Sequence, residues 1–167
     1  MANVELVGND SILQRDLFVL ELDNPEEFPE DVALSSPRFA CLLAWDARDV
    51  DAHRVRRLGR KLLDSGAVYI CAWGPDCERV HDLIDAEEIG PNPPPVVDRV
   101  IMTTWHENEP LPEAVWFVLH NSWPDEAYES GCGSTLGVAI GSTAWATEIR
   151  SAFSNPREFT SRVLRES

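Results

Sequence analysis

Three apolar segments of this chain each end in a tryptophan that is followed by a polar loop. The three junctions are Trp45-Asp46, Trp73-Gly74-Pro75-Asp76 and Trp105-His106-Glu107. An imidazole beside a carboxylate can transfer protons, and indole rings can hold a flat or apolar group. These residue types in this arrangement are typical of a ligand pocket with acid-base chemistry.

The three segments themselves, residues 39–45, 67–73 and 99–105, are continuously apolar or nearly so. Such runs are typical of parallel strands that helices cover on both faces. The carboxyl ends of parallel strands meet at one edge of the sheet, where ligands usually bind. We therefore expect Trp45, Trp73 and Trp105 to surround a common concavity at that edge.

In this interpretation His106 is the acid or base, and either Glu107 or Asp46 orients it, while the tryptophans stack the ligand. The other candidate ligand contacts are Asp76, Ser142 and Thr143. In the alternative interpretation the tryptophans only cap the core, and each indole N–H turns toward solvent or a carbonyl oxygen.

Two further combinations of reactive residues are weaker. Cys77 and His81 have the helical spacing of half a zinc site, but no second pair completes it. Cys132 lies in the glycine-rich residues 130–135, which we place at the opposite edge of the sheet, roughly 20 Å from His106 at about 3.3 Å per residue. His120 remains a possible base for this thiol. Phosphate-binding and hydrolase motifs are absent, so we expect no metal and no cofactor.

Helices alternate with these strands. The clearest is residues 50–63, where Val55, Leu58 and Leu62 share a face and Gly66 ends the helix. Weaker strands are expected at residues 135–141 and, as an edge strand, at 17–22. The remaining helices are expected at residues 75–89, 111–120, 142–153 and 156–164, although residues 115–119 also suit a strand.

This alternation predicts an α/β fold, a single three-layer open sheet that is mostly parallel, with four to five strands and helices on both faces. We expect one domain over residues 1–167, made of an acidic arm at 1–31 and a core at 39–164. The proline-rich residues 90–95 are interpreted as a stiff connector.

The net charge of −15 disfavours binding to nucleic acid and to anionic membranes. The longest apolar runs are too short to cross a bilayer, and residues 1–10 lack the features of a signal peptide. Cys41 and Cys71 fall inside apolar strands, where a buried thiol packs as a small hydrophobic group. Such unpaired thiols are expected in a reducing compartment. We therefore expect a cytoplasmic protein whose partner is neutral or basic.

The leading hypothesis is a small acidic, non-catalytic binding or accessory protein that masks a basic protein partner. The alternative is an enzyme or small-ligand receptor that works at the tryptophan-rich edge.

Charge is also distributed unevenly along the chain. Residues 1–31 hold nine acidic residues and Arg15, a net charge of −8, whereas residues 48–61 hold six basic and two acidic residues, a net charge of +4. We expect the arm to be ordered from about Leu17 and to contact the basic helix. The contact should join an arginine of residues 50–63 to one of Glu21, Asp23, Glu26 and Glu27. The competing expectation is a detached acidic tail.

Overall fold

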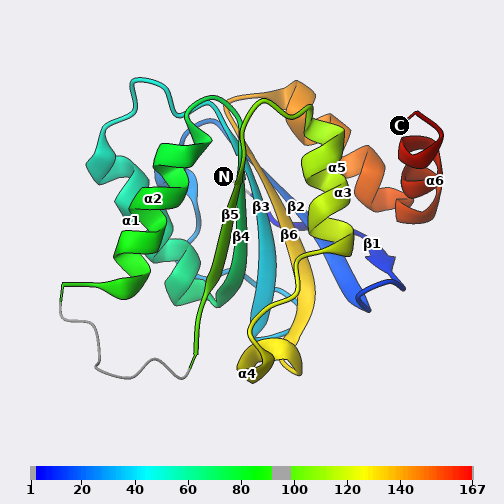
Figure 1. Cartoon of the computed structure of the whole chain (residues 1–167), viewed down its shortest axis with the longest axis horizontal. Coiled ribbons are helices and arrows are strands. Elements are labelled where there is room, and N and C mark those ends of the chain that lie inside the picture. Colours follow the sequence, from blue (N-terminus) through cyan, green and yellow to red (C-terminus); the bar gives the residue numbers. More distant parts are fainter. Residues whose placement is uncertain (1–2, 92–98, 167) are drawn as a thin grey trace.

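The computed structural model describes residues 3–91 and 99–166 (Figure 1). The strands are β1 Glu5–Asp10, β2 Arg15–Leu22, β3 Arg38–Trp45, β4 Ala67–Trp73, β5 Met102–His106 and β6 Cys132–Ile140. The helices are α1 Ala52–Ser65, α2 Cys77–Ile89, α3 Leu111–His120, α4 Glu126–Glu129, α5 Thr143–Ser154 and α6 Pro156–Glu166, and a 3-10 turn covers Pro25–Glu27.

The strands form one sheet in the order β1, β2, β6, β3, β4, β5. All neighbours pair in parallel except β1, which runs antiparallel to β2. The expected α/β class with a mostly parallel sheet is confirmed, but the described residues form six strands rather than four or five. The strand expected at residues 17–22 is not an edge strand, because β1 covers its outer side.

The strand missing from the sequence analysis is β1. Its sequence, ELVGND, has adjacent apolar residues instead of the alternation that marks a half-buried strand. Most of its side chains are exposed or half-buried, because it lies at the edge of the sheet.

Helices cover both faces of the sheet, as expected (Figure 1). α1 and α2 lie on one face, in connections that step from β3 to β4 to β5. α3 lies on the other face, in the connection that returns from β5 to β6. α5, which follows β6, lies on the same face as α3. Right-handed crossovers that run in opposite directions must pass over opposite faces, which explains the two layers.

The five helices predicted from the sequence are present with ends within two residues of the predicted ones, whereas the short helix α4 was not predicted. In α1, Val55, Leu58 and Leu62 are buried, and Gly66 ends the helix in a left-handed conformation with φ 112°. Residues 115–119 are helical, since they belong to α3. None of the described helices, of which α1 is the longest at 14 residues, could cross a bilayer.

The glycine-diluted segment at residues 135–141 belongs to β6, which lies between β2 and β3. A Cβ at Gly137 would come within 2.6 Å of Ile149 and 3.1 Å of Phe153, both on α5. Glycine therefore allows α5 to pack directly on the central strand. The glycine that weakens the strand pattern in the sequence is therefore required for this packing.

The acidic arm docks on the basic helix, as expected. Arg54 of α1 forms an ion pair with Glu26, in which Nη2 donates to Oε2 at 3.0 Å. Lys61 lies 3.5 Å from Glu30 and donates to the carbonyl oxygen of Phe28 at 3.0 Å. The arm is ordered earlier than expected, since β1 begins at Glu5.

Candidate functional site

The predicted site residues lie where the parallel strands end, but they divide between the two faces of the sheet. Successive side chains of a strand point to opposite faces. Trp45 packs in the core beneath α1 and α2, and Trp105 contacts His81 of α2 with ring centroids 4.6 Å apart. Trp73 lies on the α3 and α5 face, where the strand register places it beside His106. The expectation that the three tryptophans surround one concavity is therefore wrong.

Two of the three tryptophans are held by the core. Trp45 is buried, and the indole N–H of Trp73 donates to the carbonyl oxygen of Glu109 at 2.7 Å. The Trp73 ring also meets Trp145 edge-on, with centroids 5.0 Å apart. This arrangement matches the core-capping interpretation for Trp73. Trp105 differs, because 44% of its surface is exposed.

His106 is only 6% exposed, and both of its ring nitrogens have partners. Nδ1 lies 3.1 Å from Oε2 of Glu109, and Nε2 lies 3.0 Å from the hydroxyl oxygen of Thr104. The ring also makes an edge contact with Phe117 at 4.7 Å. The carboxylate that orients His106 is thus Glu109, and neither Glu107 nor Asp46 is its hydrogen-bond partner.

The turn after β5 explains this partner. Asn108 takes φ 60°, a left-handed conformation that asparagine tolerates better than most residues. The chain reverses there and brings Glu109 back over His106, three residues earlier. Adjacency along the strand, which favours Glu107, does not reveal this pair. The Glu-Asn-Glu-Pro sequence of the turn was the available signal.

A hollow of about 330 Å³ opens beside His106, between the loops that follow β4 and β5. We call it the histidine hollow; its lining residues are Trp73, Gly74, Pro75, Asp76, His106, Glu107, Asn108 and Glu109. It brings together four of the predicted site residues. Asp76 is already paired, since Arg79 Nε donates to its carboxylate at 2.9 Å.

A larger hollow of about 560 Å³ lies at the topological switch point of the sheet. The chain leaves β3 toward α1 on one face and leaves the neighbouring β6 toward α5 on the other. Open α/β sheets bind ligands in the crevice that such a divergence creates. We call it the switch-point hollow. Its lining side chains include Asp23, Trp45, Asp46, Arg48, Asp49, Arg54, Ser142 and Trp145.

The charges of the switch-point hollow are partly paired. Arg48 binds Asp46 through two nitrogens, at 3.0 and 2.7 Å, and this hydrogen bonding holds the pKa of the Asp46 carboxyl below its usual range. Arg54 is held by Glu26 outside the hollow. Asp23 and Asp49 form no ion pair with a described residue.

The start of α5 forms one wall of this hollow. Ser142 caps the helix by accepting from the backbone N–H of Trp145 at 3.2 Å. Thr143 donates its hydroxyl to Glu21 of β2 at 2.8 Å. The carboxylate of Glu21 therefore already compensates the positive end of the helix.

The loops at this edge also hold unusual backbone conformations. Asp49, Asp76 and Asn108 all have positive φ, at 64°, 68° and 60°. Each lies in a loop that follows a parallel strand, and each lines or adjoins one of the two hollows. Such conformations cost about 1 to 3 kcal/mol each and cluster at functional sites. This edge is therefore the candidate site.

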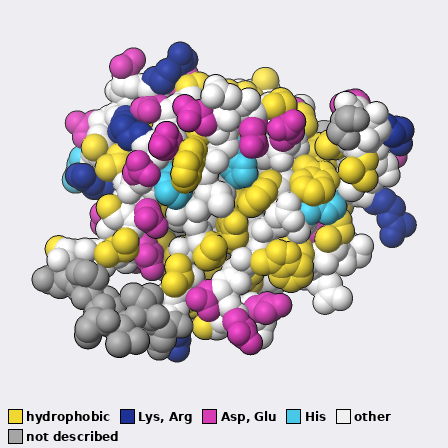
Figure 2. All heavy atoms as spheres, in the orientation of Figure 1, with side chains coloured by type: hydrophobic (Ala, Val, Ile, Leu, Met, Phe, Trp, Pro, Cys, Tyr) yellow, Lys and Arg dark blue, Asp and Glu magenta, His cyan; other side chains and the backbone are white. Residues whose placement is uncertain are grey.

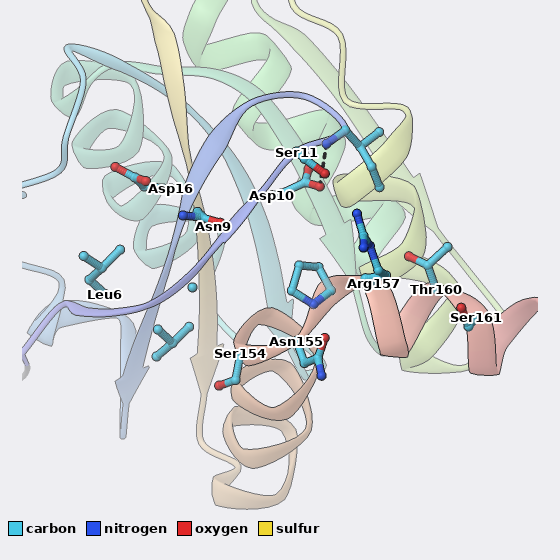
Figure 3. Close-up of a pocket in the computed structure, with 14 residues that line it drawn as sticks. Leu6, Asn9, Asp10, Ser11, Asp16, Ser154, Asn155, Arg157, Thr160 and Ser161 are labelled. Carbon is cyan, nitrogen blue, oxygen red and sulfur yellow. Dashed lines mark hydrogen bonds between the residues drawn. The ribbon is translucent and has the colours of Figure 1, made fainter.

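A still larger hollow of about 1030 Å³ lies beside β1 and the start of α6 (Figure 3). Two of its polar side chains are engaged locally: Asp10 accepts from the backbone N–H of Ile12 at 2.9 Å, and Asn155 accepts from the N–H of Glu158 at 3.3 Å. Figure 3 shows Arg157 reaching from α6 toward the hairpin rather than joining a cluster. Size without converging chemistry makes this a weaker candidate.

The other reactive residues are engaged elsewhere. Burial raises the pKa of the Cys132 thiol, which disfavours its nucleophilic form. His120 stacks on Trp116 at 4.5 Å and lies 2.9 Å from the hydroxyl of Thr160. Within residues 3–91 and 99–166, no three His, Cys, Asp or Glu side chains form a group that could hold a metal ion.

Comparison with known proteins gives a family but no activity. No curated protein and no solved structure matched the chain. One family model, described as a domain of unknown function (DUF7684), matches residues 17–156, from β2 to the start of α6. This span contains both the switch-point hollow and the histidine hollow. The chain therefore belongs to the DUF7684 family.

Proposed function

We propose that this chain is a non-catalytic binding protein that recognises a cationic group of a protein partner in the switch-point hollow. The observation that carries the proposal is the lining of this hollow, in which Asp23, Asp46 and Asp49 lie around the indoles of Trp45 and Trp145. Carboxylates accept charge-assisted hydrogen bonds from guanidinium and ammonium groups. Indole faces attract the same cations.

The two arginines of the hollow do not prevent this. Arg54 is held by Glu26, and Arg48 rests on Asp46 with 67% of its side chain exposed. An exposed ion pair contributes only about 0 to 1 kcal/mol. The guanidinium of a partner can therefore replace Arg48 at Asp46 at little cost.

An anionic ligand is a poorer fit. Glu21 already occupies the positive end of α5, and the chain has a net charge of −15. The same charge disfavours nucleic acid and anionic lipid surfaces as partners. We expect the partner to be a basic or neutral protein and the binding to take place in the cytoplasm.

The test is a titration of the ¹⁵N-labelled chain with a hexa-arginine peptide. We expect the indole signals of Trp45 and Trp145 and the amide signal of Ser142 to shift. Neutralising the hollow with Asp46→Asn and Asp49→Asn should weaken binding about tenfold, which corresponds to about 1.4 kcal/mol.

A charge-matched variant controls for net charge. Asp64→Asn and Glu158→Gln remove the same charge from exposed positions on α1 and α6, away from the hollow. Their effect should be small. Equal weakening by both pairs would mean that only net charge attracts the peptide, and the proposed site would be abandoned. A hexaglutamate peptide should leave the spectrum unchanged.

A second candidate function is an enzyme or small-ligand receptor at the histidine hollow. The pair formed by His106 and Glu109 at 3.1 Å favours it, because a carboxylate that orients an imidazole is typical of acid-base catalysis. The burial of His106 and its contact with Thr104 weigh against it. Screening a fragment library by ligand-observed NMR tests it: fragments that bind the chain but not the His106→Gln variant would support this function.

A further inference from the structure

We propose that the outer edge of β5 docks an extended, basic and apolar segment of a partner protein as an additional strand. This surface is separate from the switch-point hollow, and the inference stands without the function proposed there. β5 ends the sheet, and among the described residues only β4 pairs with it. Open strand edges are the usual template for strand addition.

The two edges of the sheet differ in a way that points to β5. Proteins protect open edges with charges, prolines, bulges or covering elements. β1, at the opposite edge, carries Glu5 and Asp10, has a bulge near Gly8 and contacts α5 and α6. β5 pairs in an unbroken register, and its sequence MTTWH contains neither a carboxylate, a lysine nor a proline. No described strand or helix therefore covers the outer side of β5 in the way that the opposite edge is covered.

Large apolar side chains accompany this open edge. Val100, Met102 and Trp105 are 42%, 38% and 44% exposed. Figure 2, which looks onto this side of the molecule, shows hydrophobic side chains following the region of β5 from one end of the sheet toward the other. Exposed apolar side chains gathered along one strand are typical of an interaction surface.

A groove of about 530 Å³ lies beside this strand. Its walls come from β5, α3 and α6, and its lining residues are Thr104, Trp105, His106, Glu109, Glu113, Trp116, Phe117, Val163 and Leu164. A strand laid along β5 points every second side chain to the same face. One bulky apolar side chain of such a strand would lie over Trp116 and Phe117.

The charges around the edge determine the kind of partner. Carboxylates lie around it: Glu109 and Glu113 line the groove, Asp85 of α2 accepts a hydrogen bond from the hydroxyl of Thr103 at 3.4 Å, and Glu107 directly follows β5 in the chain. Neither a lysine nor an arginine is among the described residues that line the groove. Figure 2 shows acidic side chains on both sides of the apolar strip, with basic ones toward the margins. Complementary charge steers a basic segment to this edge.

The same charges argue against a second copy as the occupant. Pairing two β5 edges would bring two acidic surfaces together, between two chains of net charge −15. Like charges facing each other across an interface disfavour association. The backbone of a basic segment with alternating apolar side chains would pair with the strand edge, and its basic side chains would complement the surrounding carboxylates.

Selection of random ten-residue peptides displayed on phage against the full chain tests the proposal. We expect the enriched peptides to alternate lysine or arginine with large apolar residues. A synthetic copy should slow hydrogen exchange at the backbone amides of β5. Its affinity should fall when salt rises from about 0.05 to about 0.5 M, because exposed charges are then screened.

Two lysine substitutions locate the site. Met102→Lys adds a like charge on the docking edge and should weaken the selected peptide at least about tenfold. Leu6→Lys makes the same change at an exposed position on β1, at the other edge, and should leave the affinity within about twofold. Circular dichroism must show both variants folded, and a peptide bound by the unsubstituted chain but by neither variant would mean that the site is not specific to β5.

Three other results would overturn the proposal. Selection could enrich no peptide, or only acidic ones. Bound peptide could shift the signals of Trp45 and Trp145 and leave β5 unprotected, which would support the switch-point hollow alone. Sedimentation could reveal a dimer that Met102→Lys dissociates, which would make this edge an interface between two copies.

Discussion

The guanidinium of Arg15, at the start of β2, donates to the hydroxyl of Ser122, 107 residues later in the chain, at 2.7 Å. It also donates to the Ser122 carbonyl oxygen at 2.8 Å and, more weakly, to Thr135 at 3.4 Å. All these acceptors are neutral, although Arg15 is only 4% exposed and burial lowers its pKa. A buried cation whose hydrogen-bond acceptors are neutral depends on each of these hydrogen bonds.

Replacing Ser122 with alanine should therefore destabilise the fold. The variant removes the closest acceptor of Arg15 and leaves the guanidinium buried, which should cost about 1 to 3 kcal/mol of the free energy of unfolding. Urea unfolding measures this loss. Ser154→Ala, at an exposed serine that also donates to a helix carbonyl, is the control and should cost less than about 0.5 kcal/mol. Equal losses would show that the serine-to-helix bond matters and the arginine contact does not.

His120 should make stability depend on pH. Burial lowers its pKa in the folded chain, whereas an unfolded histidine titrates near about 6.5. The unfolded chain then binds more protons below that pH, so the contribution of His120 is complete above about pH 6.5 and is lost as the pH falls through the folded pKa. The free energy of unfolding of the unsubstituted chain should drop more between pH 7 and 5 (about the range in which histidine titrates) than that of His120→Gln. His53→Gln, at an exposed histidine, should follow the unsubstituted chain.

The sequence predicts the interior of this fold better than its edges. β3 and β4 were recognisable because a strand covered on both faces must be apolar throughout. β1 was not, since an exposed edge strand needs no such pattern. The insertion of β6 between β2 and β3 leaves no local trace, because it depends on packing between segments far apart in the chain. β5 was predicted to begin at residue 99 but begins at Met102.

For the site, the sequence predicted the edge of the sheet at which the residues lie, but not which of them share a hollow. Strand direction places Trp45, Trp73 and His106 at one edge. Which of them share a hollow depends on the relative register of neighbouring strands, which one sequence does not reveal. Trp145 was missed for the same reason, since it reaches the hollow only because β6 lies beside β3.

Gly74, which lines the histidine hollow, should be sensitive to substitution because it lies against the backbone of Trp45. It has φ 118°, and a Cβ at this position would come within 2.2 Å of the carbonyl oxygen of Trp45. Gly74→Ala should cost about 1 to 3 kcal/mol of the free energy of unfolding or more. Thermal unfolding should show a decrease in Tm of about 2 to 4 °C per kcal/mol.

Gly90→Ala is the matched control for Gly74. Gly90 also has a positive φ, of 74°, but no atom of a described residue outside its chain neighbours lies within 4 Å of a Cβ built there. It carries the conformational cost without the collision, so its Tm should fall less. Equal decreases would mean that backbone strain alone, and not the contact with Trp45, sets the requirement for glycine at position 74.

Hydrogen exchange separates the two ways in which the acidic arm can be held. β2 pairs with β1 on one side and with β6 on the other, so the backbone of Phe18 to Leu22 is bonded within the sheet. The ion pair of Glu26 with Arg54 is exposed and screened by solvent, so it should contribute little to holding the arm. We therefore expect the amides of Phe18 to Leu22 to stay protected at about 1 M salt, where the Debye length is about 3 Å. Glu26→Gln should barely change their exchange rates. Protection that disappears at high salt would show that the charges hold the arm, and unprotected exchange at low salt would show that the arm is detached.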